Sequence, residues 1–152
     1  MTGRRTGVAA AVAAAALTVA VVPAAHAAAA AAPKTVALQV QYPDATRTTW
    51  CVPYRAGMTG ADVLAVANPT YGTGPYAGFV LKIGGQGTAP TSSRYWAYWE
   101  SPNGKKAAYA YSASGVTSTH PRAGSVEAWV WNTSSTTTPR KASYASLCPT
   151  GA

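Results

Sequence analysis

The chain has 152 residues, of which 12 are Lys or Arg and four are Asp or Glu, and its formal net charge at pH 7 is +8. The basic residues are scattered along the sequence, whereas a nucleic-acid-binding surface normally gathers them densely. We therefore expect no nucleic-acid partner, and we interpret the charge as an aid to solubility or a weak attraction to anionic wall polymers. The length suits one domain with a modest core.

The first 27 residues have the features of a secretory signal peptide. Arg4 and Arg5 form a basic start, residues 8–22 form an apolar run, and residues 25–27 (Ala-His-Ala) form a small-x-small cleavage site. The apolar run is short for a membrane span, so we prefer cleavage after Ala27 to the alternative of an uncleaved N-terminal anchor. Cleavage could also occur within the alanines that follow. The sequence therefore predicts a secreted, extracellular protein.

The mature chain is predicted to form one domain over residues 28–133, followed by a Ser/Thr/Pro-rich tail over residues 134–152. Cys51 and Cys148 are the two cysteines of the chain. In an exported protein they are expected to form a disulfide. The bond would close a long loop, which stabilises a fold by roughly 4–5 kcal/mol in the chain-entropy model. It would also tie the tail back onto the start of the domain.

The first half of the domain shows two strands, a helix and a short third strand. Residues 35–41 alternate apolar and polar side chains, and residues 47–52 follow a Pro-Asp-Ala turn, which predicts a β-hairpin. Thr59 and Asp62 have the spacing of a capping box for a helix that continues to Ala67 and stops before Pro69. Residues 78–83 form a short apolar strand. The glycine-rich residues 84–87 are interpreted as a plain loop, because no helix follows to hold a phosphate.

The second half of the domain carries most of the aromatic residues. Strands at 94–101 and 106–112 flank Asn103-Gly104, a dipeptide typical of two-residue hairpin turns, and residues 125–132 form the last strand. That turn would pair Tyr98 with Tyr109 and Trp96 with Tyr111. Strand alternation then predicts one aromatic face. Its six residues are Trp96, Tyr98, Tyr109, Tyr111, Trp129 and Trp131.

This aromatic face has two interpretations. The opposite face carries mainly small residues, against which a helix packs closely, so we expect the aromatic face to point outward. An exposed patch of that size indicates a platform for a flat or sugar-like ligand, or a protein interface. The alternative is that the disulfide-anchored tail folds over it as a lid. A register slip of one residue would reverse every assignment and place the site on Tyr95 and Trp99.

Four segments resemble the transcobalamin-like C-terminal domain family, which includes small secreted actinobacterial proteins. They are residues 57–64 (GMTGADVL), 78–85 (GFVLKIGG), 95–99 (YWAYW) and 123–129 (AGSVEAW). The resemblance spans about residues 36–131. It implies an α+β fold in which one helix packs on a small antiparallel sheet, as in β-grasp-like domains. In the vertebrate cobalamin carriers the equivalent domain closes over one face of the corrin ring. The resemblance therefore implies corrinoid binding and a membrane uptake system as partner.

Residues suited to catalysis or metal binding are sparse in the mature chain. His120 is its one histidine, and we interpret it as an exposed loop residue rather than a ligand of a metal carried by a bound molecule. Asp62 is interpreted as a helix cap, and Glu100 and Glu127 as charges at the rim of the aromatic face. We predict no catalytic residue, no metal site and no cofactor.

The sequence thus predicts a secreted, non-enzymatic module that binds a small planar or ring-bearing ligand, with a corrinoid as the first candidate. Delivery of that ligand to an uptake system would be its role. The alternative, from another functional class, is an extracellular protein-interaction or cell-surface component that uses an exposed aromatic face.

Overall fold

The computed structural model describes residue 3, residues 32–133 and residues 137–149. The chain divides into two units, residues 1–30 and residues 31–152, and every described strand and helix belongs to the second unit. The predicted signal peptide lies outside the described residues except for Gly3. Within the described part of the chain, no helix has the length and apolar character needed to cross a membrane.

The elements of the second unit are, in chain order, β1 (Thr35–Gln41), β2 (Arg47–Pro53), α1 (Gly60–Leu64), η1 (Ala65–Ala67), β3 (Pro69–Tyr71), η2 (Gly74–Tyr76), β4 (Val80–Ile83), β5 (Tyr95–Ser101), η3 (Lys106–Ala108), β6 (Ala110–Tyr111), β7 (Val126–Asn132) and α2 (Tyr144–Leu147). The fold is mainly β, and in broad class it is α+β as predicted. The strands at 35–41 and 47–52 and the helix that begins after Thr59 are found where the sequence placed them.

The main sheet has five strands in the order β2-β1-β7-β5-β6, and β3 and β4 form a separate two-stranded sheet. β1 is antiparallel to β2 but parallel to β7, whereas β7 is antiparallel to β5. The expectation of an entirely antiparallel sheet is therefore wrong. β7 lies in the sheet between β1 and β5. Because β1 and β5 run in opposite directions, β7 must be parallel to one of them.

Helix α1 begins with the predicted capping box. The Asp62 N–H donates to the Thr59 hydroxyl at 3.3 Å, and the Thr59 N–H donates to the Asp62 carboxylate at 2.7 Å. These two bonds satisfy backbone donors that the first helical turn leaves free, which stabilises the helix start. The helical segment ends at Asn68, which has a left-handed backbone (φ 51°) directly before Pro69.

The main core lies between the sheet and α1, on the face that carries the large aromatic residues. Val36, Leu38 and Val40 of β1 share this face with Trp96, Tyr98, Trp129 and Trp131, and all of them pack with Val63 and Leu64 of α1. The prediction that this face points outward is wrong. A five-residue helix cannot fill the space above a sheet with its own side chains, so the tryptophans and the tyrosine fill it instead.

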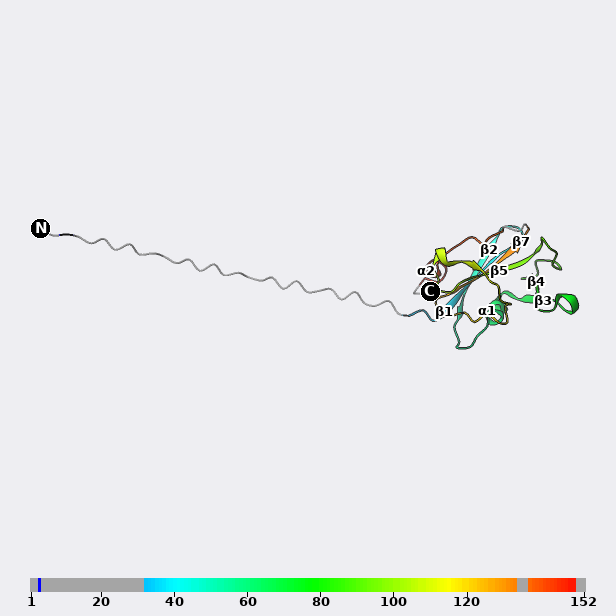
Figure 1. Cartoon of the computed structure of the whole chain (residues 1–152), viewed down its shortest axis with the longest axis horizontal. Coiled ribbons are helices and arrows are strands. Elements are labelled where there is room, and N and C mark those ends of the chain that lie inside the picture. Colours follow the sequence, from blue (N-terminus) through cyan, green and yellow to red (C-terminus); the bar gives the residue numbers. More distant parts are fainter. Residues whose placement is uncertain (1–2, 4–31, 134–136, 150–152) are drawn as a thin grey trace. The chain divides into compact units, whose positions relative to one another are not determined.

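The opposite face of the sheet is covered by the C-terminal segment. Ala37, Val126 and Ala128 pack there with Cys148, and Leu147 and Tyr144 of α2 lie against them. The small side chains allow the segment to lie close to the strands. Figure 1 shows α1 and α2 on either side of the central strands. The tail is thus a cover, as the alternative interpretation proposed, but it covers the small-residue face and not the aromatic one.

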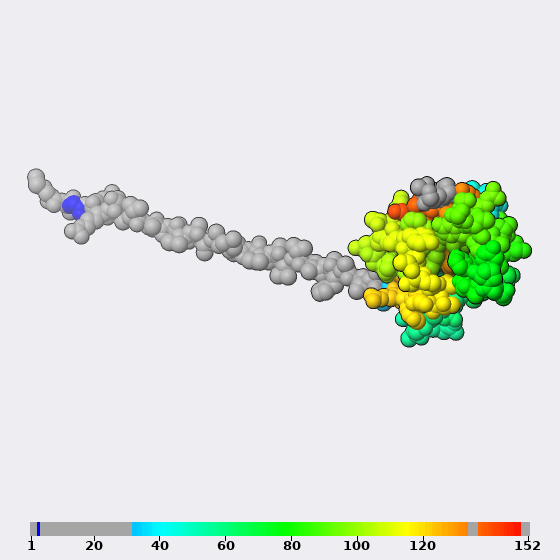
Figure 2. Space-filling view, turned by 45° about the vertical axis from the view of Figure 1, so that its right-hand side comes forward, coloured from blue at the N-terminus to red at the C-terminus, as the bar shows by residue number. Residues whose placement is uncertain are grey.

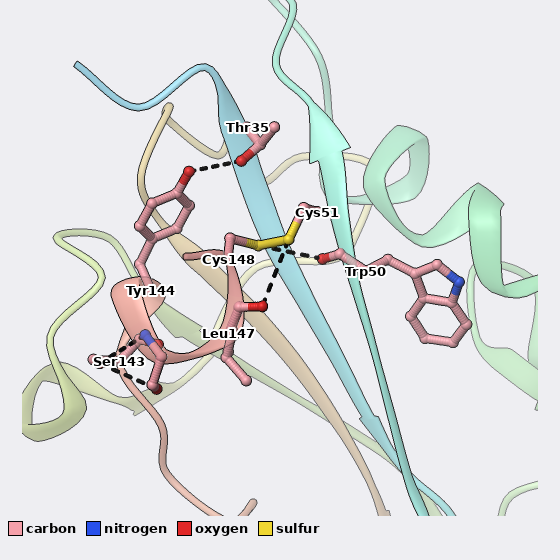
Figure 3. Close-up of a disulfide and its surroundings, with 8 residues drawn as sticks. Thr35, Trp50, Cys51, Ser143, Tyr144, Leu147 and Cys148 are labelled. Atoms are coloured by element: carbon pink, nitrogen blue, oxygen red, sulfur yellow. Dashed lines mark hydrogen bonds between the residues drawn. A yellow bond between two sulfur atoms is a disulfide. The ribbon is translucent and has the colours of Figure 1, made fainter. Parts of the chain in front are cut away.

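Figure 3 shows how the tail is fixed. The predicted disulfide between Cys51 and Cys148 is present, with 5.7 Å between the two Cα atoms. Next to it, the hydroxyls of Thr35 and Tyr144 are hydrogen-bonded at 2.6 Å. The side-chain amide of Gln39, buried on the same face, donates to the Arg140 carbonyl at 2.8 Å. The tail therefore completes the fold on this side.

The hairpin register predicted from Asn103-Gly104 is also wrong. Trp99 pairs with Tyr111, and Glu100 pairs with Ala110, because η3 takes up three residues before β6 begins. The Gly104 carbonyl accepts a hydrogen bond from the Tyr144 N–H at 2.8 Å, so the turn is shaped by the tail and not by its own two residues alone. Tyr111 was predicted to pair with Trp96 and instead pairs with Trp99. Because the register has shifted by an odd number of residues, the side chain of Tyr111 lies on the same face as that of Trp99.

Candidate functional site: an aromatic cleft

A cleft of about 420 Å³ opens beside the first half of β5. Residues 77–80, which end at the first residue of β4, form one wall, and residues 111–116, which begin at the last residue of β6, form the other. We call it the aromatic cleft, because six of its lining residues carry aromatic rings. These are Phe79, Tyr95, Trp96, Tyr98, Tyr111 and Trp129. In Figure 2 the two walls lie side by side on the surface, residues 77–80 in green and residues 111–116 in yellow.

The β4 wall brings Phe79 to the rim. Gly78 has a φ of 83°, a left-handed conformation that glycine adopts without strain. The Gly72 N–H donates to the Phe79 carbonyl at 2.9 Å, which fixes the backbone at this point. The side chain is left free of the core, and Phe79 is 53% exposed. The one phenylalanine of the chain is therefore held at the surface by its backbone.

The opposite wall is tied to the fold at both ends. The Ser112 N–H donates to the Tyr98 carbonyl of β5 at 2.9 Å, and the Ala61 N–H of α1 donates to the Val116 carbonyl at 3.0 Å. At the rim, Tyr111 is 53% exposed and lies edge-on to Trp99, with ring centroids 5.6 Å apart. Burial raises the pKa of Tyr111, and the neighbouring Tyr95 side chain adds to the rise. The ring of Tyr111 therefore lies between Trp99 and Tyr95 at the rim.

The floor of the cleft is formed by core residues. Tyr98 of β5 and Trp129 of β7 are directly paired across the sheet, and their rings stack with centroids 4.5 Å apart and planes 8° apart. Trp96 is buried beside them and meets Trp131 edge-on at 5.4 Å. Stacked and edge-to-face pairs at these distances add to the stabilisation given by burial. The floor therefore consists of buried rings packed against one another, whereas Phe79 and Tyr111 at the rim are exposed.

A buried carboxyl group lies in contact with the floor. The Tyr98 hydroxyl donates a short hydrogen bond to Glu127 of β7, which is 2% exposed. The pKa of Glu127 is raised to about 7, mainly by burial. The hydrogen bonds from Tyr98 and Ser125 oppose the rise, and Glu100, paired opposite on β5, contributes to it. Burial and the nearby Glu127 likewise raise the pKa of Tyr98. The interpretation of Glu127 as a rim charge is wrong.

The approach of α1 to this pair requires Gly60. A Cβ atom at Gly60 would lie 2.5 Å from the Tyr98 hydroxyl oxygen and 3.0 Å from the Val116 carbonyl oxygen. A glycine at the first helical position therefore lets the helix lie directly over the buried hydroxyl.

The six residues predicted to form one site are found in three places. Trp96, Tyr98 and Trp129 form the floor of the cleft and Tyr111 its rim. Trp131 shares their face but lines a separate depression with Arg94. Tyr109 lies under the tail, where its hydroxyl donates to the Ala142 carbonyl at 2.9 Å.

Two cleft residues, Phe79 and Tyr95, were not predicted as part of the site. Phe79 reaches the cleft because of the β3–β4 sheet, and Tyr95 reaches it because β5 is longer than its partner β6. The residues around Phe79 and Tyr95 contain no sequence pattern that predicts either arrangement. His120 is exposed, and its Nδ1 atom lies 3.3 Å from the Met58 carbonyl oxygen. Among the described residues, no three His, Cys, Asp or Glu side chains are gathered as they would be around a metal ion.

Comparison with solved structures shows that the chain has a distant structural likeness to known proteins. No protein-family model matches the chain. No curated protein matches it either. A crystal structure from Ruminococcus gnavus ATCC 29149, described as that of a "putative metal binding protein", is similar with a TM-score of 0.49 and 16% sequence identity. The similarity covers 66% of this chain and 97% of that one. A likeness this distant carries neither a family nor a function over to this chain.

Proposed function

We propose that this chain is a secreted, non-enzymatic module that binds a ring-bearing small molecule in the aromatic cleft. The observation that carries the proposal is the pair of half-exposed rings, Phe79 and Tyr111, held by their backbones over a floor of buried aromatic residues. Exposed rings on both sides of a cleft are suited to enclose a flat group. The cleft volume of about 420 Å³ lies within the range of small-molecule sites, roughly 300–1,000 Å³.

The lining supports binding in preference to catalysis. Besides its six aromatic residues it offers the hydroxyls of Ser112 and Ser114, and the Ser112 hydroxyl is engaged with the Ser114 carbonyl at 2.9 Å. Activation of a serine as a nucleophile needs a neighbouring base, and none of the lining residues is a histidine or a carboxylate. Recognition by stacking and by hydroxyl groups is what this lining supplies.

A corrinoid remains the first candidate ligand. The four segments that resemble the transcobalamin-like C-terminal domain family include the one that supplies Phe79 and the one that supplies Tyr95, Trp96 and Tyr98. The strand order also supports the resemblance, since the first and last long strands lie side by side and parallel in the middle of the sheet, as in β-grasp-like domains. The cleft would take one edge or side group of so large a ring. Delivery to a membrane uptake system would then be the role of the module.

The test is a titration of the ¹⁵N-labelled mature protein with cyanocobalamin, followed by NMR. We expect the amide signals of residues 77–80 and 111–116 to shift. Phe79→Ala and Tyr111→Ala should each weaken binding by about tenfold, because a stacking contact contributes about 0.5–1.5 kcal/mol beyond its buried area. Tyr54→Ala is the matched control, since Tyr54 is exposed but does not line the cleft. Shifts confined to other residues would contradict the proposed site.

A protein-interaction role is the second candidate. It is favoured by three exposed aromatic residues in and around the β3–β4 unit, namely Tyr71, Tyr76 and Phe79. Sedimentation velocity over a range of protein concentrations tests self-association through this surface. If the protein remains monomeric and its cleft signals respond to a small molecule, the binding-module proposal is preferred.

A further inference from the structure

We infer that the aromatic cleft prefers a positively charged organic group, such as a quaternary ammonium, over a neutral or an anionic group of the same shape. This inference rests on the proposed function, because it names the chemical class of ligand for the same cleft.

The first observation concerns the charge of the lining. The 152-residue chain has 12 basic residues and a net charge of +8, yet none of the residues that line the cleft is basic. An anionic ligand would therefore lose its hydration without gaining a guanidinium or ammonium partner. Burying an unpaired charge in this way is costly. The lining disfavours anions despite the overall charge of the chain.

The second observation is the number of aromatic rings around one small space. The faces of aromatic rings carry partial negative charge, and a cation within about 6 Å of a ring centre is attracted to it. Phe79 and Tyr111 present exposed rings on opposite walls, and Tyr95 lies next to Tyr111. A group with a diffuse positive charge can contact several such rings at once, because it needs no directed hydrogen bonds.

The third observation is the pair of carboxyl groups next to the floor. Glu127 accepts a hydrogen bond from Tyr98, and Glu100 is paired with Glu127 across the two strands. Both act electrostatically on the Tyr98 hydroxyl, and Tyr98 itself lines the cleft. Above pH 7, where Glu127 is ionised, the negative charge below the floor attracts a cation and repels an anion, because charges interact more strongly in a partly dehydrated site than in water.

The basic residues nearest in sequence do not cancel this effect. Lys82 follows the β4 wall and Arg94 precedes Tyr95, but both are exposed and neither lines the cleft. Exposed charges are screened by salt over about 8 Å at physiological ionic strength. The lining and the two carboxyl groups that act on Tyr98 therefore decide which charge the cleft prefers.

Three small probes of the same shape separate charge from size. Choline carries a trimethylammonium group, 3,3-dimethylbutan-1-ol replaces its nitrogen by carbon, and 3,3-dimethylbutanoate is the anion. Each is titrated into the ¹⁵N-labelled mature protein at pH 8 while the signals of residues 77–80 and 111–116 are followed. We expect choline to bind more tightly than the neutral alcohol by about 2- to 30-fold, the range given by cation–π contacts. The anion should bind most weakly.

Two variants test the role of the carboxyl groups. Glu127→Gln keeps the size of the side chain and an acceptor for Tyr98 but removes the charge. It should reduce the advantage of choline over the alcohol. Glu100→Gln is the second variant, because Glu100 is only half-buried and its replacement disturbs the core less. It should reduce the same advantage by a smaller factor.

The outcomes distinguish this inference from the proposed function. If the neutral alcohol shifts the cleft signals at the same concentrations as choline, the preference for a cation is wrong and the cleft remains a binding site. The same conclusion follows if cyanocobalamin shifts these signals and choline does not. If neither cyanocobalamin nor any of the three probes shifts them, both proposals fail.

Discussion

Glu127 makes the stability of this protein depend on pH in an unusual direction. Its carboxyl group is buried in the core beside Tyr98, and burial raises its pKa from the ordinary 4.5 to about 7. The folded state therefore keeps a proton that the unfolded chain has already lost between these two pH values. Stability rises with pH only where the unfolded chain binds more protons, so here it falls as pH increases from about 4.5 to about 7.

The size of the effect follows from the two pKa values. A difference of one pKa unit corresponds to about 1.4 kcal/mol, so the rise from 4.5 to about 7 corresponds to about 3 kcal/mol of stability, present at pH 4.5 and lost above pH 7. Glu127→Gln has no proton to lose. We compare the unfolding free energy of the variant with that of the wild type at pH 4.5 and at pH 8. The difference should change by about 3 kcal/mol in favour of the variant between these two pH values.

Urea unfolding of both proteins at pH 4.5, 6, 7 and 8 measures this difference. Glu100→Gln is the control, because it removes the neighbouring charge that helps to raise the pKa of Glu127. It should reduce the pH dependence without abolishing it. If the difference in unfolding free energy between wild type and Glu127→Gln stays constant over this range, Glu127 titrates normally and its assignment to the core is wrong.

Four further predictions concern the tail, the helix, the core and processing. Reduction of the Cys51–Cys148 disulfide, whose cysteines are 97 residues apart, should lower the unfolding free energy by about 4–5 kcal/mol. Urea titrations with and without reductant measure this, and an unchanged midpoint would contradict the role of the tail. Thr59→Ala removes the helix cap and should cost about 1 kcal/mol in the same assay, whereas Thr49→Ala on an exposed strand position should change little. Trp129→Ala should lower the unfolding free energy by about 3–5 kcal/mol, because Trp129 is 4% exposed and stacked on Tyr98. If its thermal melt matched that of Tyr111→Ala, Trp129 would not be a core residue. Sequencing of the secreted protein should find its N-terminus within residues 28–33, and material that retains Met1 would exclude the signal peptide.

The local features of the fold could be predicted because each depends on neighbouring residues. The spacing of Thr59 and Asp62 is enough to specify the capping box. Strand alternation correctly placed Trp96, Tyr98, Trp129 and Trp131 on one face, since alternation depends only on the strand itself. The disulfide could be predicted because the chain has two cysteines and was expected to be exported.

The choice of which face meets the helix could not be predicted in the same way. Alternation says which side chains share a face, but not which face is covered. That choice depends on the tail, which lies closely over Ala37 and Ala128 and leaves the other face for α1. The same tail contacts Gly104 and changes the hairpin register, so Tyr111 leaves the predicted face and reaches the rim of the cleft.

Four of the six predicted binding residues line the cleft, but their roles differ from the prediction. Trp96, Tyr98 and Trp129 form the buried floor, and the exposed contacts come from Tyr111 and Phe79. Phe79 was predicted only as part of a short apolar strand. Its exposure results from the left-handed backbone at Gly78 and the small β3–β4 sheet, which are long-range features that a single strand pattern does not contain.

We propose that the aromatic cleft holds a small molecule in the native protein. Native mass spectrometry of protein recovered from the culture medium of the organism that encodes it is the decisive experiment. The wild-type protein should carry an added mass of defined size, and a Phe79→Ala/Tyr111→Ala double variant with an unchanged melting temperature should lose it. A bound mass that the double variant keeps, or a wild-type protein that carries none, would contradict the claim.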